Sequence, residues 1–153
     1  MATFETSPDA HRSRIESTAP PKVSIVVPAF NEANRIRESL LRIQQFLKTA
    51  SFTFEVLVVD DGSRDATSTI VKEVQFPGLH LIRNDVNHGK GFAVRMGVLE
   101  ARGEHVLFTD ADLSAPIEEL DKLLAAAYAE DADVVIGSRA VDRKMIEKHQ
   151  STG

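Results

Sequence analysis

Short, nearly continuous apolar segments recur along the chain and alternate with longer segments of helical periodicity. The short segments are residues 23–27, 54–59, 79–82, 105–108 and 134–136. A strand that is covered on both faces is apolar at consecutive positions, whereas a strand with one solvated face alternates between apolar and polar residues. The pattern therefore predicts five strands that are buried on both faces.

Four amphipathic helices are predicted between these strands. Asn31 and Asp65 are suitable N-terminal caps for the first two helices. Gly89-Lys90-Gly91 opens the third helix, and Pro116 suits the first turn of the fourth. The expected apolar positions are, helix by helix, Ile36, Leu40, Ile43 and Leu47; Ile70, Val71 and Val74; Val94, Val98 and Leu99; and Ile117, Leu120, Leu124 and Ala127. Alternating strands and helices indicate the α/β class: a Rossmann-like three-layer αβα sandwich with a mostly parallel sheet.

Composition and charge narrow the possible functions. The chain has 153 residues, of which 42% are apolar and 27% are charged, as expected for one domain with a hydrophobic core. The formal net charge of -5 and the lack of a basic stripe argue against a nucleic-acid partner. Without cysteine, the chain has neither disulfides nor thiolate metal ligands. No apolar run has the length needed to span a bilayer.

The apolar pattern also predicts the domain organisation. Residues 1–21 are polar and lack the apolar stretch of a secretory signal, so we expect a flexible N-terminal tail and a cytoplasmic protein. Residues 22–140 hold all the predicted strands and helices and form the expected domain. Residues 141–153 are a polar C-terminal tail.

Polar residues that can bind a ligand or a metal follow the predicted strands at the point where each strand ends. Residues 28–32 follow the first strand, Asp60 and Asp61 the second, residues 110–112 the fourth and residues 137–139 the fifth. In open α/β sheets, ligands bind outside the carboxyl ends of the strands. We therefore expect these residues to meet in one cleft.

The motif Asp110-Ala111-Asp112 is the sharpest of these signals. Two carboxylates one residue apart can face the same ion, and hard oxygen ligands suit Mg²⁺ or Mn²⁺, which also bind substrate phosphates. An isolated Asp-x-Asp is more often a solvated turn. Here the motif directly follows a buried strand, and other polar loops converge on it, so a metal site is favoured.

Three further residues are candidate ligand contacts. We expect Asp60 to accept hydrogen bonds from a base N–H or ribose hydroxyls, while Asp61 or Asp65 shapes the turn. Lys90 lies in a glycine-flanked turn at a helix start, which resembles a phosphate cradle but lacks the spacing of a P-loop. Arg139 follows the fifth strand and can pair with a phosphate. The structural alternative for each is a turn, a cap or a solvated side chain.

Six motifs, in chain order, resemble those of family 2 glycosyltransferases, which have the GT-A fold. They are Val26-Val27-Pro28-Ala29-Phe30-Asn31-Glu32, Val59-Asp60-Asp61-Gly62-Ser63-Arg64-Asp65, Asn87-His88-Gly89-Lys90-Gly91, Ala101-Arg102-Gly103, Asp110-Ala111-Asp112 and Gly137-Ser138-Arg139. The resemblance extends from about residue 23 to residue 139. Within the family, the chain most resembles the polyprenyl-phosphate sugar transferases, above all the dolichyl-phosphate β-glucosyltransferases, with the mannose synthases as near relatives.

The resemblance implies an enzyme that moves glucose from UDP-glucose to a dolichyl or polyprenyl phosphate with inversion, using Mg²⁺ or Mn²⁺. A lipid acceptor implies peripheral association with the cytoplasmic face of a membrane. The alternatives are mannosyl transfer from GDP-mannose, a polysaccharide or glycolipid acceptor, and a fragment that binds nucleotide sugar without catalysis. Members of the family continue further, so residues 141–153 are expected to begin a missing acceptor region.

The resemblance also assigns donor-binding residues. Pro28, Phe30 and Glu32 are expected to line the base and ribose of the nucleotide. Asp60 is expected to hold the nucleotide as well.

The remaining assignments concern the diphosphate and the sugar. Asp110 and Asp112 are expected to approach the metal and the diphosphate, which gives Asp112 a catalytic role. Ala111 is expected to leave room for the sugar, and Arg139 to face the phosphates or the acceptor.

Overall fold

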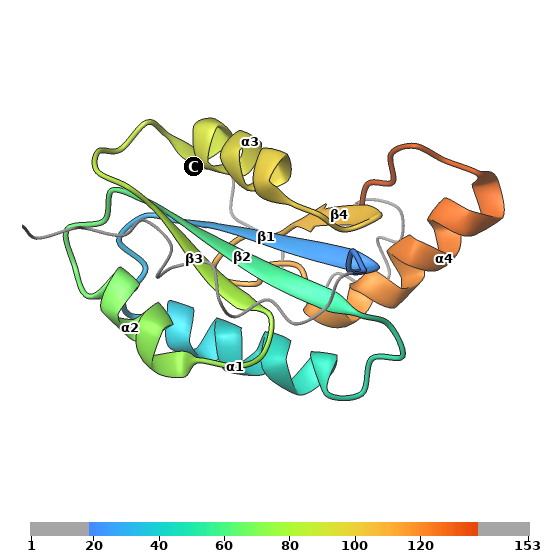
Figure 1. The fold of residues 1–153 in the computed structure, drawn as a ribbon, viewed down its shortest axis with the longest axis horizontal. Coiled ribbons are helices and arrows are strands. Elements are labelled where there is room, and N and C mark those ends of the chain that lie inside the picture. Colours follow the sequence, from blue (N-terminus) through green and yellow to red (C-terminus); the bar gives the residue numbers. More distant parts are fainter. Residues whose placement is uncertain (1–18, 138–153) are drawn as a thin grey trace, which may run out of the picture.

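The computed structural model describes residues 19–137, which form a parallel sheet with helices on both faces (Figure 1). The elements, in chain order, are β1 (Val23–Ala29), α1 (Ile36–Leu47), β2 (Phe54–Asp61), α2 (Thr67–Val74), β3 (Leu79–Asn84), α3 (Lys90–Glu100), β4 (His105–Phe108), the 3-10 turn η2 (Ile117–Glu119) and α4 (Leu120–Glu130). The predicted α/β class and parallel sheet are confirmed. Most of the two predicted tails, and Arg139, lie outside the described residues.

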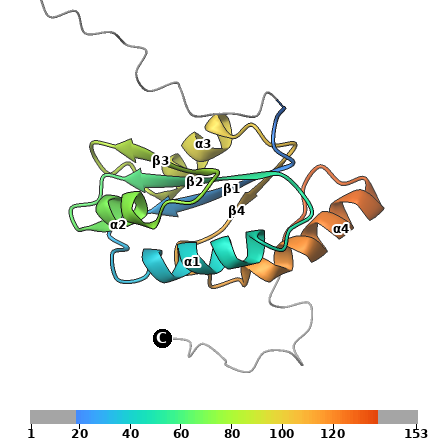
Figure 2. The same cartoon turned by 60° about the horizontal axis from the view of Figure 1, so that its bottom comes forward.

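The four strands are ordered β3-β2-β1-β4, and every neighbouring pair is parallel. The chain steps outward from β1 to β2 and β3, and then returns to the other side of β1 to form β4. Parallel crossovers are almost always right-handed, so a reversal of direction moves the connecting helix to the opposite face. Accordingly, α1 and α2 cover one face and α3 covers the other (Figure 2).

Each face of the sheet has its own core. The larger core packs the sheet against α1, α2 and η2, and includes the predicted apolar residues Ile36, Leu40, Ile43 and Leu47 of α1, all buried. The smaller core lies under α3 and consists of Val26, Leu57, Val59 and Ala93. β1, which is buried at every position, therefore separates two cores.

The buried face of α3 differs from the prediction. Val98 and Leu99 are 43% and 67% exposed, whereas Ala93 and Gly97 face the sheet. A Cβ atom at Gly97 would lie 2.3 Å from Cγ1 of Val26. The helix thus approaches the sheet through its small residues, and a search for large apolar residues selects the wrong face.

Two predicted boundaries at the end of β1 are also wrong. The strand continues through Pro28 to Ala29, because the carbonyl of Val26 accepts from Thr109 beyond the end of β4, and Pro28 lies two residues further on the same side, where β4 no longer runs. No ladder bond is lost there. Asn31 does not cap α1, which begins only at Ile36.

The predicted fifth strand is absent from the described residues. Val134 and Ile136 are 76% and 81% exposed and lie in irregular chain that follows α4. A short apolar run becomes a strand only where a neighbouring strand satisfies its backbone groups. No described strand pairs with it. Within residues 19–137, no helix has the length and apolar character needed to cross a membrane.

We expect Gly97→Ala to lower the free energy of unfolding by about 1–3 kcal/mol, because the added methyl group overpacks the contact between α3 and Val26. Gly91→Ala in the same helix is the matched control. A Cβ atom there meets nothing within 4 Å, and alanine favours helix by up to about 1 kcal/mol. Urea denaturation measures both, and equal effects would contradict the close approach.

Candidate functional site

The carboxyl ends of β1, β2 and β4 and the start of α3 enclose a cavity of about 420 Å³. It lies where the strand order reverses, and such a switch point is the usual ligand crevice of open α/β sheets. Seven of the predicted site residues line it: Pro28, Phe30, Glu32, Lys90, Asp110, Ala111 and Asp112. The structure thus gathers residues from three separate loops, as expected from the strand ends.

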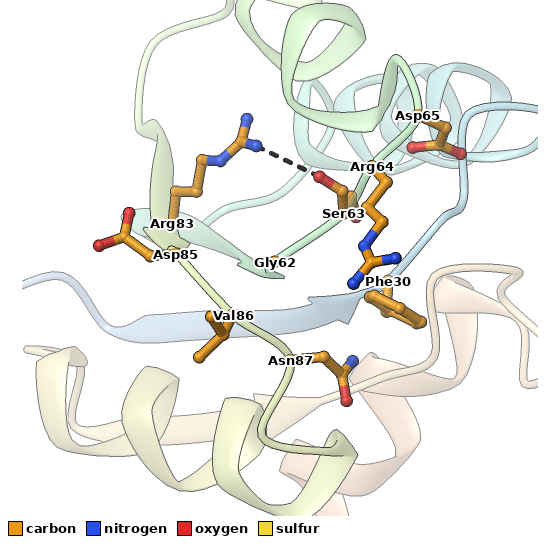
Figure 3. A pocket seen from close by; sticks show the side chains of 9 residues that line it. All are labelled: Phe30, Gly62, Ser63, Arg64, Asp65, Arg83, Asp85, Val86 and Asn87. Atoms are coloured by element: carbon orange, nitrogen blue, oxygen red, sulfur yellow. Dashed lines mark hydrogen bonds between the residues drawn. The ribbon is translucent and has the colours of Figure 1, made fainter.

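A second cavity of about 410 Å³ adjoins the first, and the two share Phe30 and Asn87 (Figure 3). Arg83 and Asp85, at the end of β3, lie at one end of it, and Phe30 lies toward the other. The Arg83 guanidinium donates to the carbonyl of Ser63 at 3.2 Å. The two cavities together form a groove along the rim of the sheet.

Asp60 does not line either cavity, in contrast to the expectation. Its side chain is fully buried and accepts hydrogen bonds from the Ser63 N–H, at 2.8 Å, and from the Ser68 hydroxyl. Asp60 shares strand parity with Val58, which faces α1 and α2, so its carboxylate stabilises the turn on that side.

Asp61 has the opposite parity and faces α3, so it is Asp61 that lines the larger cavity. Its carboxylate accepts from the Asn84 amide at 2.7 Å and from the N–H groups of His88 and Gly89 at 2.9 and 2.7 Å. Burial by itself raises the pKa of Asp61, but these three hydrogen bonds outweigh it and hold the pKa below its ordinary value. The carboxylate is therefore ionised at neutral pH and fixes the loop that carries Lys90.

The loop after β1 is bound to the loop after β2 by side chain to backbone hydrogen bonds. Asn31 has a left-handed φ of 55°, donates its N–H to the Ser63 hydroxyl at 2.9 Å and accepts from the Arg64 N–H at 2.9 Å. The Glu32 N–H donates to the Thr67 hydroxyl at 2.9 Å. These contacts fix the backbone next to Phe30 and Glu32, both of which line the larger cavity.

The two carboxylates of the Asp-Ala-Asp motif follow β4. Oδ1 of Asp110 lies 2.5 Å from Nζ of Lys90. Oδ1 of Asp112 accepts from the hydroxyl and the N–H of Ser114 at 2.7 and 3.0 Å, and Oδ2 lies 4.0 Å from Nη1 of Arg35. The Ser114 hydroxyl, then its N–H, and then Arg35 hold the pKa of Asp112 below its ordinary value. Both carboxylates thus have cationic partners.

The donor set fits a cation that is shared with a substrate. Among residues 19–137, no three His, Cys, Asp or Glu side chains are grouped as metal ligands. Mg²⁺ and similar ions are commonly bound by one or two carboxylates, with the other positions filled by water and substrate phosphates. Asp110 and Asp112 supply such a pair, and Ala111 between them is small and buried.

Sequence comparison identifies the family. Residues 24–150 match the profile of the family "Glycosyl transferase family 2". The chain belongs to glycosyl transferase family 2. The GT-A fold expected for this family is confirmed by solved structures that superpose on the chain.

Similar proteins cover most of this family 2 chain. It is 38% identical over 141 residues to the dolichyl-phosphate β-glucosyltransferase of Drosophila melanogaster, a match that covers 82% of this chain and 43% of that protein. A mannosyltransferase from Pyrobaculum calidifontis, solved with GDP-Man and Mn²⁺, is 33% identical with a TM-score of 0.59, covering 78% of this chain and 35% of that one. Glucosyl-3-phosphoglycerate synthase of Mycobacterium tuberculosis, solved with Mn²⁺ and UDP, is 26% identical with a TM-score of 0.54, covering 71% and 39%. The chain spans about two fifths of the length of the curated relatives it matches.

We expect Asp61→Asn to lower the free energy of unfolding by roughly 2 kcal/mol at pH 7, because an amide cannot accept from three donors as this carboxylate does. The folded pKa of Asp61 lies below the unfolded value of about 3.9. Its contribution is therefore complete at neutral pH and is lost as the pH falls from about 5 through the folded pKa. Urea titrations from pH 7 to pH 3 should show the difference between wild type and variant shrinking in acid.

The matched control is Asp85→Asn, which removes the same charge from an exposed side chain on the same rim. We expect it to change the free energy of unfolding by less than about 0.5 kcal/mol at every pH. If both variants behave alike, the buried hydrogen bonds of Asp61 do not stabilise the loop.

Proposed function

We propose that the protein is a glycosyltransferase that moves a hexose from a nucleotide sugar to a polyprenyl or dolichyl phosphate with inversion, with UDP-glucose as donor. The observation that carries the proposal is the cavity that places Lys90, Asp110 and Asp112 together, beside a second cavity that can take a nucleoside. Glucose and the lipid acceptor are proposed from the dolichyl-phosphate β-glucosyltransferase of Drosophila melanogaster, at 38% identity.

The groove suggests how the donor lies. Phe30 belongs to both cavities, so the ribose lies beside it, with Pro28 and Glu32 at its edge and the base directed toward Arg83 and Asp85. Asp61, rather than the expected Asp60, makes the polar contact to the nucleotide, because Asp61 is the carboxylate that lines the cavity. The diphosphate then reaches Lys90 at the start of α3, where helix N–H groups also favour an anion.

Asp110 and Asp112 are the residues that would hold Mg²⁺ or Mn²⁺ on the diphosphate. The metal supplies charge neutralisation on the departing nucleoside diphosphate. Lys90 adds a second positive charge to the same leaving group. Ala111, which lines the cavity without side-chain bulk beyond a methyl group, leaves space for the hexose.

The proposed reaction is a single displacement. An oxygen of the acceptor phosphate forms a bond to the anomeric carbon while the bond from that carbon to the diphosphate oxygen breaks on the opposite face, which inverts the configuration. The acceptor oxygen is already anionic, so no general base is required. Because the acceptor is a lipid phosphate, we also propose that the protein acts at the cytoplasmic face of a membrane.

Mannosyl transfer from GDP-mannose is the second candidate. It is supported by the Pyrobaculum calidifontis mannosyltransferase, solved with GDP-Man and Mn²⁺ at 33% identity. The same groove would hold either donor. The uracil of one donor and the guanine of the other would both lie at the end lined by Arg83 and Asp85.

We expect the full-length protein to transfer label from radiolabelled UDP-glucose to polyprenyl phosphate in vesicles that contain Mn²⁺, giving a lipid that mild acid hydrolyses. Transfer from GDP-mannose instead would support the second candidate. Label found only in saccharide would contradict the lipid acceptor. Binding of UDP and Mn²⁺ without any transfer would show a nucleotide-sugar-binding protein that does not catalyse.

We expect Asp112→Asn to reduce turnover by roughly 100-fold or more at saturating donor and metal, because the leaving diphosphate loses a metal ligand. Thermal melting should be nearly unchanged, since the side chain is exposed. Asp121→Asn, an exposed aspartate on α4, is the control and should keep its turnover. Retained turnover in Asp112→Asn would refute the metal role of this carboxylate.

A further inference from the structure

Ion pairs between loops occupy the carboxylates that the proposed function gives to the metal. Lys90 Nζ, from the start of α3, lies 2.5 Å from Oδ1 of Asp110, which follows β4. Arg35, from the loop after β1, lies 4.0 Å from Asp112 and also pairs with Glu32 at 3.0 Å. The Lys90 contact is thus the closer one, and its ammonium is not shared with another acid among the described residues.

The Lys90 ammonium and a divalent cation cannot both approach the same oxygen of Asp110. A metal such as Mg²⁺ lies about 2.1 Å from its carboxylate ligands. At 2.5 Å from Oδ1, the ammonium of Lys90 fills nearly that position. A metal that binds Asp110 through this oxygen must therefore displace Lys90, so binding of the metal alone includes the cost of breaking the ion pair.

A bound diphosphate changes this balance. Lys90 lines the same cavity as both aspartates, and its side chain is 61% exposed on a flexible four-carbon stem. It can leave Asp110 and pair with a phosphate oxygen without any movement of the backbone. The diphosphate thus offers Lys90 a second anion and, at the same time, offers the metal its remaining oxygen ligands.

We propose that Lys90 holds the metal position on Asp110 until a nucleoside diphosphate arrives, and then transfers to the diphosphate, so that metal and nucleotide bind cooperatively. This inference rests on the proposed function, because it uses the same cavity and the same metal. Its content is the coupling between the two ligands. Such coupling is reciprocal, so the metal strengthens nucleotide binding by the same factor by which the nucleotide strengthens metal binding.

The experiment measures Mn²⁺ affinity of the full chain by calorimetry, with and without saturating UDP, for wild type and Lys90→Met. Without UDP, we expect Lys90→Met to bind Mn²⁺ about twofold to fivefold more tightly than wild type, the range that one exposed ion pair can contribute. We expect the ratio of the Mn²⁺ Kd values without and with UDP to fall by at least the same factor. UDP should bind the variant more weakly.

Two variants serve as controls. Lys48→Met removes the same charge at the far end of α1, and any change that it causes measures the effect of net charge alone. Lys90→Arg keeps a cation at the site and should restore most of the coupling.

The outcomes separate this inference from the proposed function. If wild type binds UDP and Mn²⁺ cooperatively and Lys90→Met shows the same Mn²⁺ affinity and coupling, the transfer of Lys90 is overturned while the donor site stands. Weaker binding of Mn²⁺ alone in Lys90→Met also overturns it, since Lys90 would then assist the metal rather than compete with it. If wild type binds neither UDP nor Mn²⁺, the proposed function fails, and this inference fails with it.

Discussion

The buried carboxylate of Asp61 is the contact on which the site depends. It ends β2, accepts from Asn84 at the end of β3 and from the backbone of His88 and Gly89 just before α3, and so joins two strands to the helix. A carboxylate is the side chain best suited to this position, because it can accept from several donors at once. The backbone that presents Lys90 to the cavity is therefore held in place by a carboxylate at the end of β2, far from Lys90 in the sequence.

The strand order explains why this interaction lies beside the acidic motif. β1 is central, and the chain places β2 and β3 on one side of it and β4 on the other. The loop after β1 leads to α1 on one face of the sheet and the loop after β3 leads to α3 on the other, which opens a crevice at the point of reversal. The loop that carries Lys90 closes the crevice from the α3 side, where Asp61 holds it.

The sequence predicted the parts of the fold that depend on large apolar residues. The positions of the four strands and the buried face of α1 follow from periodicity, but β4 is not buried on both faces as predicted, since Val106 and Phe108 are 41% and 55% exposed. The buried face of α3 could not be predicted in this way, because Ala93 and Gly97 pack on the sheet by being small. The helix sequence alone does not reveal the shape of the sheet surface that they contact. The apolar residues 134–136 led to the wrong prediction of a strand, because a strand also requires a neighbouring strand to pair with.

Strand parity could have distinguished the two aspartates of the second strand. Val56 and Val58 face the larger core, so Asp60 faces it too, while Leu57 and Val59 place Asp61 on the side of α3. The prediction that favoured Asp60 rested on its position at the strand end and on resemblance, and neither of these says which face of the sheet the side chain points to. Which cations accompany Asp110 and Asp112 lay beyond the sequence altogether, because Arg35 and Lys90 come from loops that only the reversed strand order brings together.

The charges of the crevice favour a complete set of ligands over any single one. Two carboxylates alone would attract divalent cations from solution, and two cations alone would attract stray phosphates. Because Lys90 and Arg35 neutralise Asp110 and Asp112, each class of ligand must compete with an ion pair that is already present. In the proposed function, a nucleoside diphosphate with its metal would satisfy both members of each pair together, so the contacts that weaken partial occupancy would not oppose the full complex. The exposure of these side chains keeps the energies small, which allows the pairs to exchange partners without strain in the buried framework that Asp61 holds.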